Sequence, residues 1–311
     1  MYDEERRRQI AAALAEATSG PFGEAAIDLL GTLGYKSNRR LRARSDSPAD
    51  FLALFAESKE LNRQQALLDE WVTADFLFQF TGDEVAGARP QQRLFEGDTK
   101  WEKSRMESYL FVAIGLCRDS YTRTELASIT RAMNRLFEMP VMLLFRHGST
   151  VTLSVIDRRP GKRDPSTDVL EKVTQIKDIR VAAPHRAHIE ILYDLCLDVL
   201  YEKHNFHDFN GLHSAWRATL DISELNKRFY KEIANWYFWA LKHVQFPKDA
   251  PKTDGKDHVS IIRLITRLIF CWFIKEKDLI PDSLFERRVL ERELVGFAPD
   301  SEDVPVLVEN Q

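Results

Sequence analysis

The chain opens with four stretches in which apolar residues recur every three to four positions, the spacing of a helix with one buried face. They cover residues 3–17, 23–33, 47–56 and 62–71. Between the second and the third lies KSNRRLRAR, which holds five basic residues from Lys36 to Arg44 and no acid. We interpret this segment as a short basic arm that includes Arg39 and Arg40, with a plain flexible linker as the alternative.

The pattern changes at Ala74, where two continuous apolar runs, ADFLFQF and SYLFVAIGL, are too short for helices and predict strands buried on both faces. The polar segment 83–105 between them predicts a loop. A helix over residues 122–137 follows, with an apolar face that includes Leu126 and Ile129. Its opposite face carries Arg123, Arg131 and Arg135. This helix is therefore expected to bury its apolar side and to expose its basic side.

A hairpin and one further strand complete this region. VMLLF and TVTLSVI are joined through Gly148, a residue that suits a turn with positive φ. The segment RRPGKRDPS predicts a loop, and KVTQIKDIRV, which ends at Val181, predicts a strand. The order strand, helix, strand, strand, strand indicates an α/β or α+β core, and we assign the fold as α+β.

Every segment after Pro184 has a helical pattern. The predicted helices cover residues 184–203, 209–220, 221–244, 258–279 and 284–294, and Asp221 with Glu224 forms a capping box for the third. We therefore expect three segments. They are a helical segment with the basic arm at 1–72, the α/β core at 73–182, and a helical connector at 183–311.

Composition limits the class of protein. A content of 44% hydrophobic residues in 311 residues supports real cores, and a net charge of -4 requires any polyanion site to be a local cluster of Lys and Arg. The three cysteines are far apart, which is typical of a reduced cytoplasmic protein. The apolar run from Ile261 to Ile274 is shorter than a bilayer span and is interrupted by arginines, so we expect no membrane association.

The second predicted strand bears on catalysis. Metal-dependent nucleases of the restriction type hold Mg²⁺ with an acid on one strand and a Glu-x-Lys on the next. Here the strand ends with Gly115 and Cys117 at those positions, which predicts that this centre is lost. Substitute acids are available nearby, although solvated surface acids are the favoured interpretation for them. These acids are Glu96, Asp98, Glu107 and Glu125.

The basic residues instead indicate binding to a polyanion. Arg158, Arg159, Lys162 and Arg163 lie close together after the hairpin, and guanidinium groups suit phosphate oxygens. An ordinary solvated face with Asp157 and Asp164 is an equally good interpretation of this segment. No metal site is predicted, because the histidine pairs of the chain lack a third ligand or an HExxH pattern.

Long blocks of the chain resemble the N-terminal region of type IIG restriction-modification enzymes, in which a nuclease precedes an adenine-specific DNA methyltransferase. They include ESYLFVAIGLCRDSYTRTELASITRAMNRLFEMPVMLLFRHGSTVTLSVIDRRPGKRD, LNKRFYKEIANWYFWAL and IIRLITRLIFCWFIKEKDLIPDSLF. The resemblance implies a restriction-endonuclease-like core with Glu-x-Lys at the end of the ESYLF strand, where this chain has Gly115 and Cys117. The methyltransferase motifs of such enzymes are not found in the 311 residues.

The sequence therefore predicts a cytoplasmic, DNA-interacting component of a restriction-modification or phage-defence system with a degenerate nuclease-like core. Double-stranded DNA is the expected partner, with a separate DNA methyltransferase chain as a second one. Binding would need no cofactor, and Mg²⁺ only if the protein cleaves DNA. Two alternatives stay open at this point. They are an active Mg²⁺-dependent endonuclease with a relocated acid, and a scaffold for a methyltransferase that does not itself bind DNA.

Overall fold

The computed structural model describes residues 2–17, 20–41, 43–55, 61–87, 107–160, 168–220, 222–244, 256–275, 277 and 279–293. At some of these positions, 157–160 and 168–171 among them, only the backbone is described. The chain divides into two compact units, which we call the sheet unit (Met1–Leu225) and the helical unit (Asn226–Gln311). Each has its own cluster of buried apolar residues.

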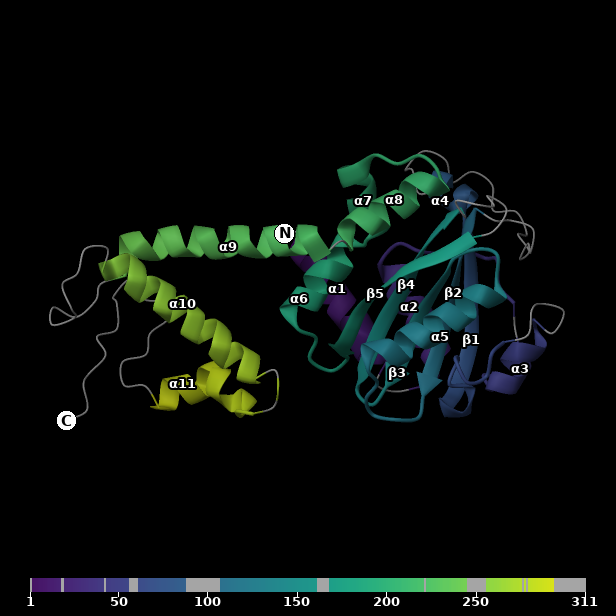
Figure 1. Ribbon diagram of the computed structural model, residues 1–311, viewed down its shortest axis with the longest axis horizontal. Coiled ribbons are helices and arrows are strands. Elements are labelled where there is room, and N and C mark those ends of the chain that lie inside the picture. The colour runs from purple at the N-terminus through teal and green to yellow at the C-terminus, as the bar shows by residue number, and fades with distance from the viewer. Residues whose placement is uncertain are drawn as a thin grey trace. The chain divides into compact units, whose positions relative to one another are not determined.

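Five strands form the sheet of the sheet unit, in the order β1-β2-β3-β4-β5 (Figure 1). They are β1 (Trp71–Thr81), β2 (Ser108–Leu116), β3 (Val141–His147), β4 (Thr150–Pro160) and β5 (Asp168–Arg180). Strands β2 and β3 run parallel, joined by α5 (Arg123–Leu136), and the other described neighbours are antiparallel. The predicted α+β class and the order strand, helix, strand, strand, strand are confirmed.

Helices cover both faces of this sheet, so that every residue of β2 is buried (Figure 1). Val112 and Ile114 point to one face, where they join a cluster with α5 and α3 (Pro48–Ala53). Phe111 and Ala113 point to the other face. The helices on that side are α1 (Tyr2–Glu16), α2 (Phe22–Thr32), α6 (Arg186–Asp194), α7 (Leu197–His204) and α8 (Phe209–Thr219).

Segments that are distant in the sequence share this second core. The Tyr35 hydroxyl donates a hydrogen bond to the Leu195 carbonyl at 2.7 Å and accepts one from Trp216 Nε1 at 2.8 Å, and all three residues are buried. The sequence placed boundaries after residues 72 and 182. The structure instead divides the chain after Leu225, because helices from before and after the sheet pack on it.

Some predicted elements differ from the structure. The helix expected at 62–71 is a short 3₁₀ helix (Leu68–Glu70) that leads into β1, because Leu67 adopts positive φ and the Trp71 indole donates to the Ala66 carbonyl. Residues 83–105, expected as a loop, begin with α4 (Gly82–Gly87), and 88–105 lie outside the described residues. The single helix expected at 184–203 is α6 and α7, because the Leu197 amide leaves the helix to bind the Leu33 carbonyl.

The helical unit contains most of α9 (Ile222–His243), then α10 (Lys256–Lys275), a 3₁₀ helix (Asp282–Phe285) and α11 (Arg287–Glu293). Ala240 of α9 and Ile261 and Ile265 of α10 form its buried cluster. Asp221 of the predicted capping box lies outside the described residues. None of the helices described by the structure has the length and apolar character that a membrane crossing requires.

Candidate functional site

The end of β2 is the place where the resemblance to restriction-type nucleases predicts a catalytic Glu-x-Lys. Gly115 pairs there with Thr73 of β1 and Arg146 of β3. A Cβ atom at residue 115 would lie 2.5 Å from Thr73 Oγ1, a hydroxyl oxygen that finds no hydrogen-bond partner among the described residues. The neighbouring strand thus approaches the Cα of Gly115 closely. A glutamate fits at this position only if Thr73 moves.

A carboxylate, Asp75, lies on the same face of the sheet as this glycine, and two further acids lie close to Asp75; the sequence analysis missed all three. Asp75 of β1 pairs with Ala113, on the same face of the sheet as Gly115. Burial raises the pKa of Asp75, and the charges of Asp46 and Glu24 raise it further. We call Gly115, Thr73, Asp75, Asp46 and Glu24 the Gly115 corner. A signal for it exists in the sequence, because Asp75 is the single charged residue within the apolar run of β1.

The Gly115 corner does not fit a magnesium centre. Residue 115 supplies no oxygen ligand, and residue 117 is a cysteine in place of a lysine. Among the described residues, no group of three or more His, Cys, Asp or Glu is arranged to hold a metal ion.

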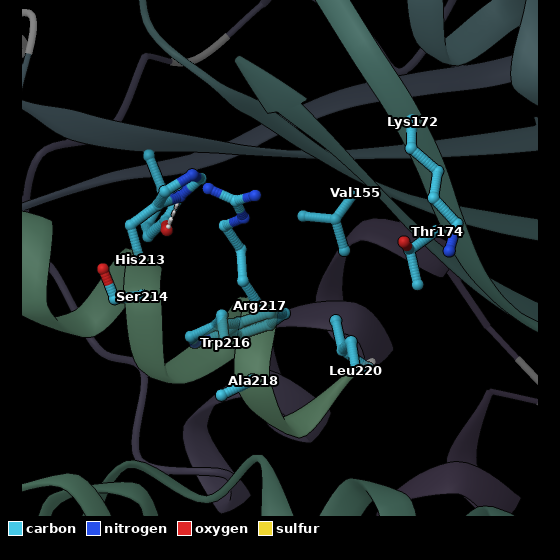
Figure 2. Close-up of a pocket in the computed structure, with 10 residues that line it drawn as sticks. Val155, Lys172, Thr174, His213, Ser214, Trp216, Arg217, Ala218 and Leu220 are labelled. Carbon is cyan, nitrogen blue, oxygen red and sulfur yellow. Dashed lines mark hydrogen bonds between the residues drawn. The ribbon is translucent and has the colours of Figure 1, made fainter. Parts of the chain in front are cut away.

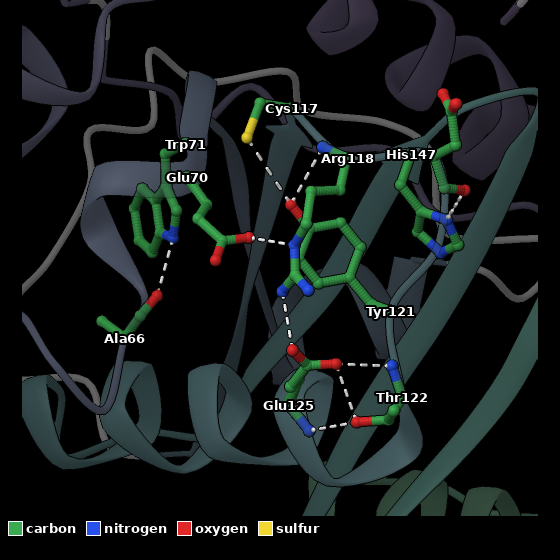
Figure 3. Close-up of polar contacts among 10 residues, drawn as sticks. Ala66, Glu70, Trp71, Cys117, Arg118, Tyr121, Thr122, Glu125 and His147 are labelled. Carbon is green, nitrogen blue, oxygen red and sulfur yellow. Dashed lines mark hydrogen bonds and ion pairs between the residues drawn. The ribbon is translucent and has the colours of Figure 1, made fainter.

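Glu125, a candidate for a relocated catalytic acid, has a structural role (Figure 3). Its carboxylate accepts hydrogen bonds from the Thr122 amide at 2.7 Å and the Thr122 hydroxyl at 2.8 Å, which closes the capping box of α5. Arg118 donates to the same carboxylate at 2.6 Å and to Glu70 at 2.7 Å. The Thr122 amide, followed by Arg118, lowers the pKa of Glu125 to about 2. These bonds keep Glu125 ionised and fully engaged.

The other candidate acids are not at the Gly115 corner. Glu107 is exposed and directly precedes β2, at the opposite end of the strand from Gly115. Glu96 and Asp98 lie outside the described residues. Cys117 is exposed, and its thiol lies 3.9 Å from the Tyr121 hydroxyl, which also accepts a hydrogen bond from the Arg118 amide (Figure 3). Of the predicted substitute acids, the two that the structure describes, Glu107 and Glu125, thus do not lie at this corner.

A two-stranded ribbon leaves the sheet at its other end. Strand β4 pairs with β3 as far as Ser154, whereas its pairing with β5 continues to Pro160. Arg158 and Arg159 were predicted to lie in a loop, and this prediction is wrong, because both belong to β4 and pair with Leu170 and Val169. Lys162 and Arg163 lie outside the described residues. We call the last three pairs of this extension, 158–160 with 168–170, the β4–β5 ribbon.

Arg39 is not available to DNA, which corrects the prediction for this residue. Its side chain is only 4% exposed and pairs with Asp83 at 2.9 Å and Glu84 at 3.3 Å. The Arg39 carbonyl accepts a hydrogen bond from the Gln79 amide, so this part of the arm is an extended segment packed beside β1. Arg40, the next residue, is exposed, and its contact with DNA stays a prediction.

The arginines of α5 lie on the face of the sheet opposite the Gly115 corner. Arg123 and Arg135 are exposed and Arg131 is half-buried. Arg135 donates to the Gln65 side chain at 2.6 Å, and the Arg123 carbonyl accepts a 3.4 Å hydrogen bond from Gln175 of β5. The structure therefore brings Arg123, at the start of α5, close to β5. Arg135, near the end of the helix, instead contacts the segment that precedes β1.

The predicted DNA-contacting ribbon and the expected catalytic position are far apart. Gly115 pairs with Arg146, which pairs with Val151 at the start of β4. From Val151 to Arg158 is seven residues of strand, which corresponds to roughly 20 Å. A duplex that contacts the ribbon is thus not positioned by it at the Gly115 corner.

Comparisons with known proteins add no counterpart for this arrangement. No protein-family model, no curated protein and no solved structure matches the chain. The similarity to type IIG enzymes stays a prediction, and the functional argument depends on the charges and geometry of the chain itself.

Proposed function

We propose that this protein binds double-stranded DNA through the β4–β5 ribbon and does not cleave it. The observation that carries the proposal is the extension of the β4–β5 pairing beyond β3, out to Pro160 and Asp168. The six residues 158–163 contain four Lys or Arg and no acid. A basic two-stranded ribbon has the width and charge to enter the major groove of DNA.

Phosphate contact is the main source of affinity in such a complex, because each neutralised phosphate releases a counterion. The ribbon supplies Arg158 and Arg159, and Lys162 and Arg163 follow within the same short stretch of sequence. The net charge of -4 makes the rest of the surface a poor polyanion ligand on average, so the local cluster decides the binding face. Exposed Arg40 and Arg123 are candidates for additional backbone contacts.

The absence of cleavage follows from the Gly115 corner. Gly115 and Cys117 provide neither a hard oxygen ligand nor an ammonium group, and Glu125 is committed to its helix cap. Binding through the ribbon requires no metal ion. The similarity of the long sequence blocks to type IIG enzymes supports a role as a DNA-interacting component of a restriction-modification or phage-defence system.

The test uses the full chain and a labelled duplex in a fluorescence-anisotropy titration. We expect affinity to fall steeply between about 50 and about 200 mM salt. Replacing Arg158, Arg159, Lys162 and Arg163 together with alanine should weaken binding about tenfold or more at low salt and flatten its salt dependence.

The matched control removes four exposed arginines from other surfaces, Arg8, Arg63, Arg186 and Arg288, so that the change in net charge is the same. This variant should bind DNA within about twofold of the wild-type protein. Equal weakening by the two sets would contradict a specific ribbon contact, and affinity indifferent to salt would contradict the proposal as a whole.

A plasmid-cleavage assay with Mg²⁺ or Mn²⁺ separates the proposal from an active nuclease. We expect intact supercoiled plasmid at all protein concentrations. Cleavage that disappears in Glu107→Gln or Glu125→Gln would favour the alternative with a relocated acid. Both variants keep the size of the side chain. Because Glu125→Gln also removes the ion pair with Arg118 at the cap of α5, circular dichroism checks its folding.

One observation favours a second function, docking of another protein chain. The described residues of the helical unit expose many large apolar side chains, among them Tyr230 at 69%, Phe238 at 60% and Phe270 at 60%. In the sheet unit, Val72 is the one exposed residue of this kind among those described. Large exposed apolar patches mark protein interaction sites. Co-purification of a DNA methyltransferase, with no retention on DNA, would favour this scaffold function.

A further inference from the structure

A pocket of about 410 Å³ lies between α8 and the β4–β5 pair, on the face of the sheet that α1 and α2 also cover (Figure 2). Its volume is in the range of small-molecule sites. Val155 and Thr174, which are paired across the two strands, form one wall. Helix α8 forms the other wall with His213, Trp216 and neighbouring residues.

The lining is positively charged. Lys172 reaches the pocket from β5 and Arg217 from α8, and Figure 2 shows them on either side of Val155. Both residues are exposed. Of the described residues that line the pocket, none carries a carboxylate, and Thr174 and Ser214 add hydroxyl groups. Two cations and two hydroxyls around one small volume are suited to a phosphate group.

The inner part of the pocket is aromatic and rigid. Trp216 is 2% exposed, and its indole nitrogen is bound to the Tyr35 hydroxyl at 2.8 Å. Tyr109 is 1% exposed, and its hydroxyl lies 2.6 Å from His213 Nδ1. Because these two side chains are almost fully buried, they form a rigid floor, and the aromatic ring that a ligand can reach is that of the half-buried His213.

We propose that this pocket binds a mononucleotide unit, with the phosphate between Lys172 and Arg217 and the base against the ring of His213. Two sources can supply this chemistry, a free nucleoside 5′-phosphate or the 5′-phosphorylated end of a DNA strand. Lys172 is two residues from Leu170, which pairs with Arg158, so the pocket adjoins the β4–β5 ribbon. The inference goes beyond the proposed duplex contact and does not depend on it.

The first experiment measures binding to the full chain by isothermal titration calorimetry with deoxyadenosine 5′-phosphate, deoxyadenosine and inorganic phosphate as separate probes. We expect the nucleotide to bind more tightly than either of its parts. The Lys172→Gln, Arg217→Gln double variant should weaken nucleotide binding about tenfold or more, because two charge-assisted contacts are lost.

The control variant is Arg63→Gln with Arg186→Gln, which removes two exposed charges from other surfaces. It should leave nucleotide affinity unchanged. Circular dichroism checks the folding of both variants, which is expected to be intact because all four side chains are exposed. No detectable nucleotide binding, or equal weakening by the two variants, would overturn the proposal.

The second experiment identifies the source by competition with single-stranded oligonucleotides that carry a 5′-phosphate or a 5′-hydroxyl. Displacement by the phosphorylated strand alone supports a DNA end as the ligand. Failure of both strands to displace the bound nucleotide supports the free nucleotide. Equal displacement by both strands would overturn recognition of the phosphate.

The two proposals can fail separately. The ribbon variant, with Arg158, Arg159, Lys162 and Arg163 replaced, is expected to keep its affinity for free deoxyadenosine 5′-phosphate. The pocket variant is expected to keep its affinity for closed circular duplex DNA, which has no strand ends. A wild-type protein that binds the nucleotide but not the duplex would reject the proposed function alone, and one that binds the duplex but not the nucleotide would reject the pocket alone.

Discussion

The two ends of the central sheet are built from the same strands but differ in chemistry. At the Gly115 corner, strands β1 and β2 pack closely, and three acids lie together where no metal-binding group is described. At the other end, the β4–β5 ribbon carries Arg158 and Arg159, and a positively charged pocket adjoins it. Because the ends are roughly 20 Å apart, a substitution at one end leaves the residues of the other end in place.

The largest expected effect concerns a basic residue that serves the fold. Arg39→Ala leaves Glu84, whose side chain is 16% exposed, without its buried partner. We expect unfolding to become easier by about 3 kcal/mol, measured by chemical denaturation. Duplex affinity measured on the folded fraction should stay within about twofold of wild type.

Arg40→Ala is the matched control, because the neighbouring side chain is exposed. Its cost should stay below about 0.5 kcal/mol. A destabilised Arg40→Ala variant, or an Arg39→Ala variant that lost DNA binding while remaining as stable as wild type, would remove the distinction between structural and surface arginines.

The packing of the Gly115 corner predicts an intermediate effect. In Gly115→Ala the new methyl group would lie 2.5 Å from Thr73 Oγ1, so Thr73 must rotate or the strands must separate. We expect a loss of about 1–3 kcal/mol in the free energy of unfolding.

A double-mutant cycle with Thr73→Ala identifies the cause. Removal of the Thr73 hydroxyl should recover most of the loss, because that oxygen is the nearest atom to the new methyl group. Additive effects in the cycle would show that the cost of Gly115→Ala arises elsewhere, and the close approach of the two strands would then lose its importance.

The smallest effect has the opposite sign. The pKa of Asp75 is raised above 3.8 by burial and by neighbouring acids, so the folded state disfavours the charged carboxylate that prevails at neutral pH. Stability from this group is complete below pH 3.8 and is lost as the pH rises through the folded-state pKa. Asp75→Asn should therefore raise the melting temperature at neutral pH. The gain should shrink as the pH falls toward 3.8, and a gain that grew on acidification would contradict a raised pKa.

Prediction from the sequence worked where local pattern and burial agree. The apolar run of β2, the amphipathic pattern of α5 and the hairpin at Gly148 were all found, because a strand buried on both faces and a helix with one dry side have distinct periodicities. The element over 62–71 was wrong, since the indole of Trp71 and the positive φ of Leu67 terminate the helical pattern through contacts that periodicity does not encode.

The site was predicted less completely than the fold. Sequence spacing identified Gly115 and Cys117 but gave no reason to place Glu24 and Asp46 beside Asp75, because these acids come from three separate segments. The sequence alone gave no reason to expect that Arg39 is buried and Arg40 is exposed. They differ in the structure because the carboxylates of Asp83 and Glu84 reach only the first of them.

The sequence by itself determined the α+β class and the order of strands and helix along the core. It also determined the Gly115 and Cys117 at the end of β2 and the basic composition of residues 158–163. These features depend on residue type and local periodicity. The tertiary structure alone decided which charges are buried, that Arg158 and Arg159 extend a ribbon, and that Lys172 and Arg217 line one pocket. These features depend on segments distant in the chain that come together in space, where burial and pairing set the chemistry of each charge.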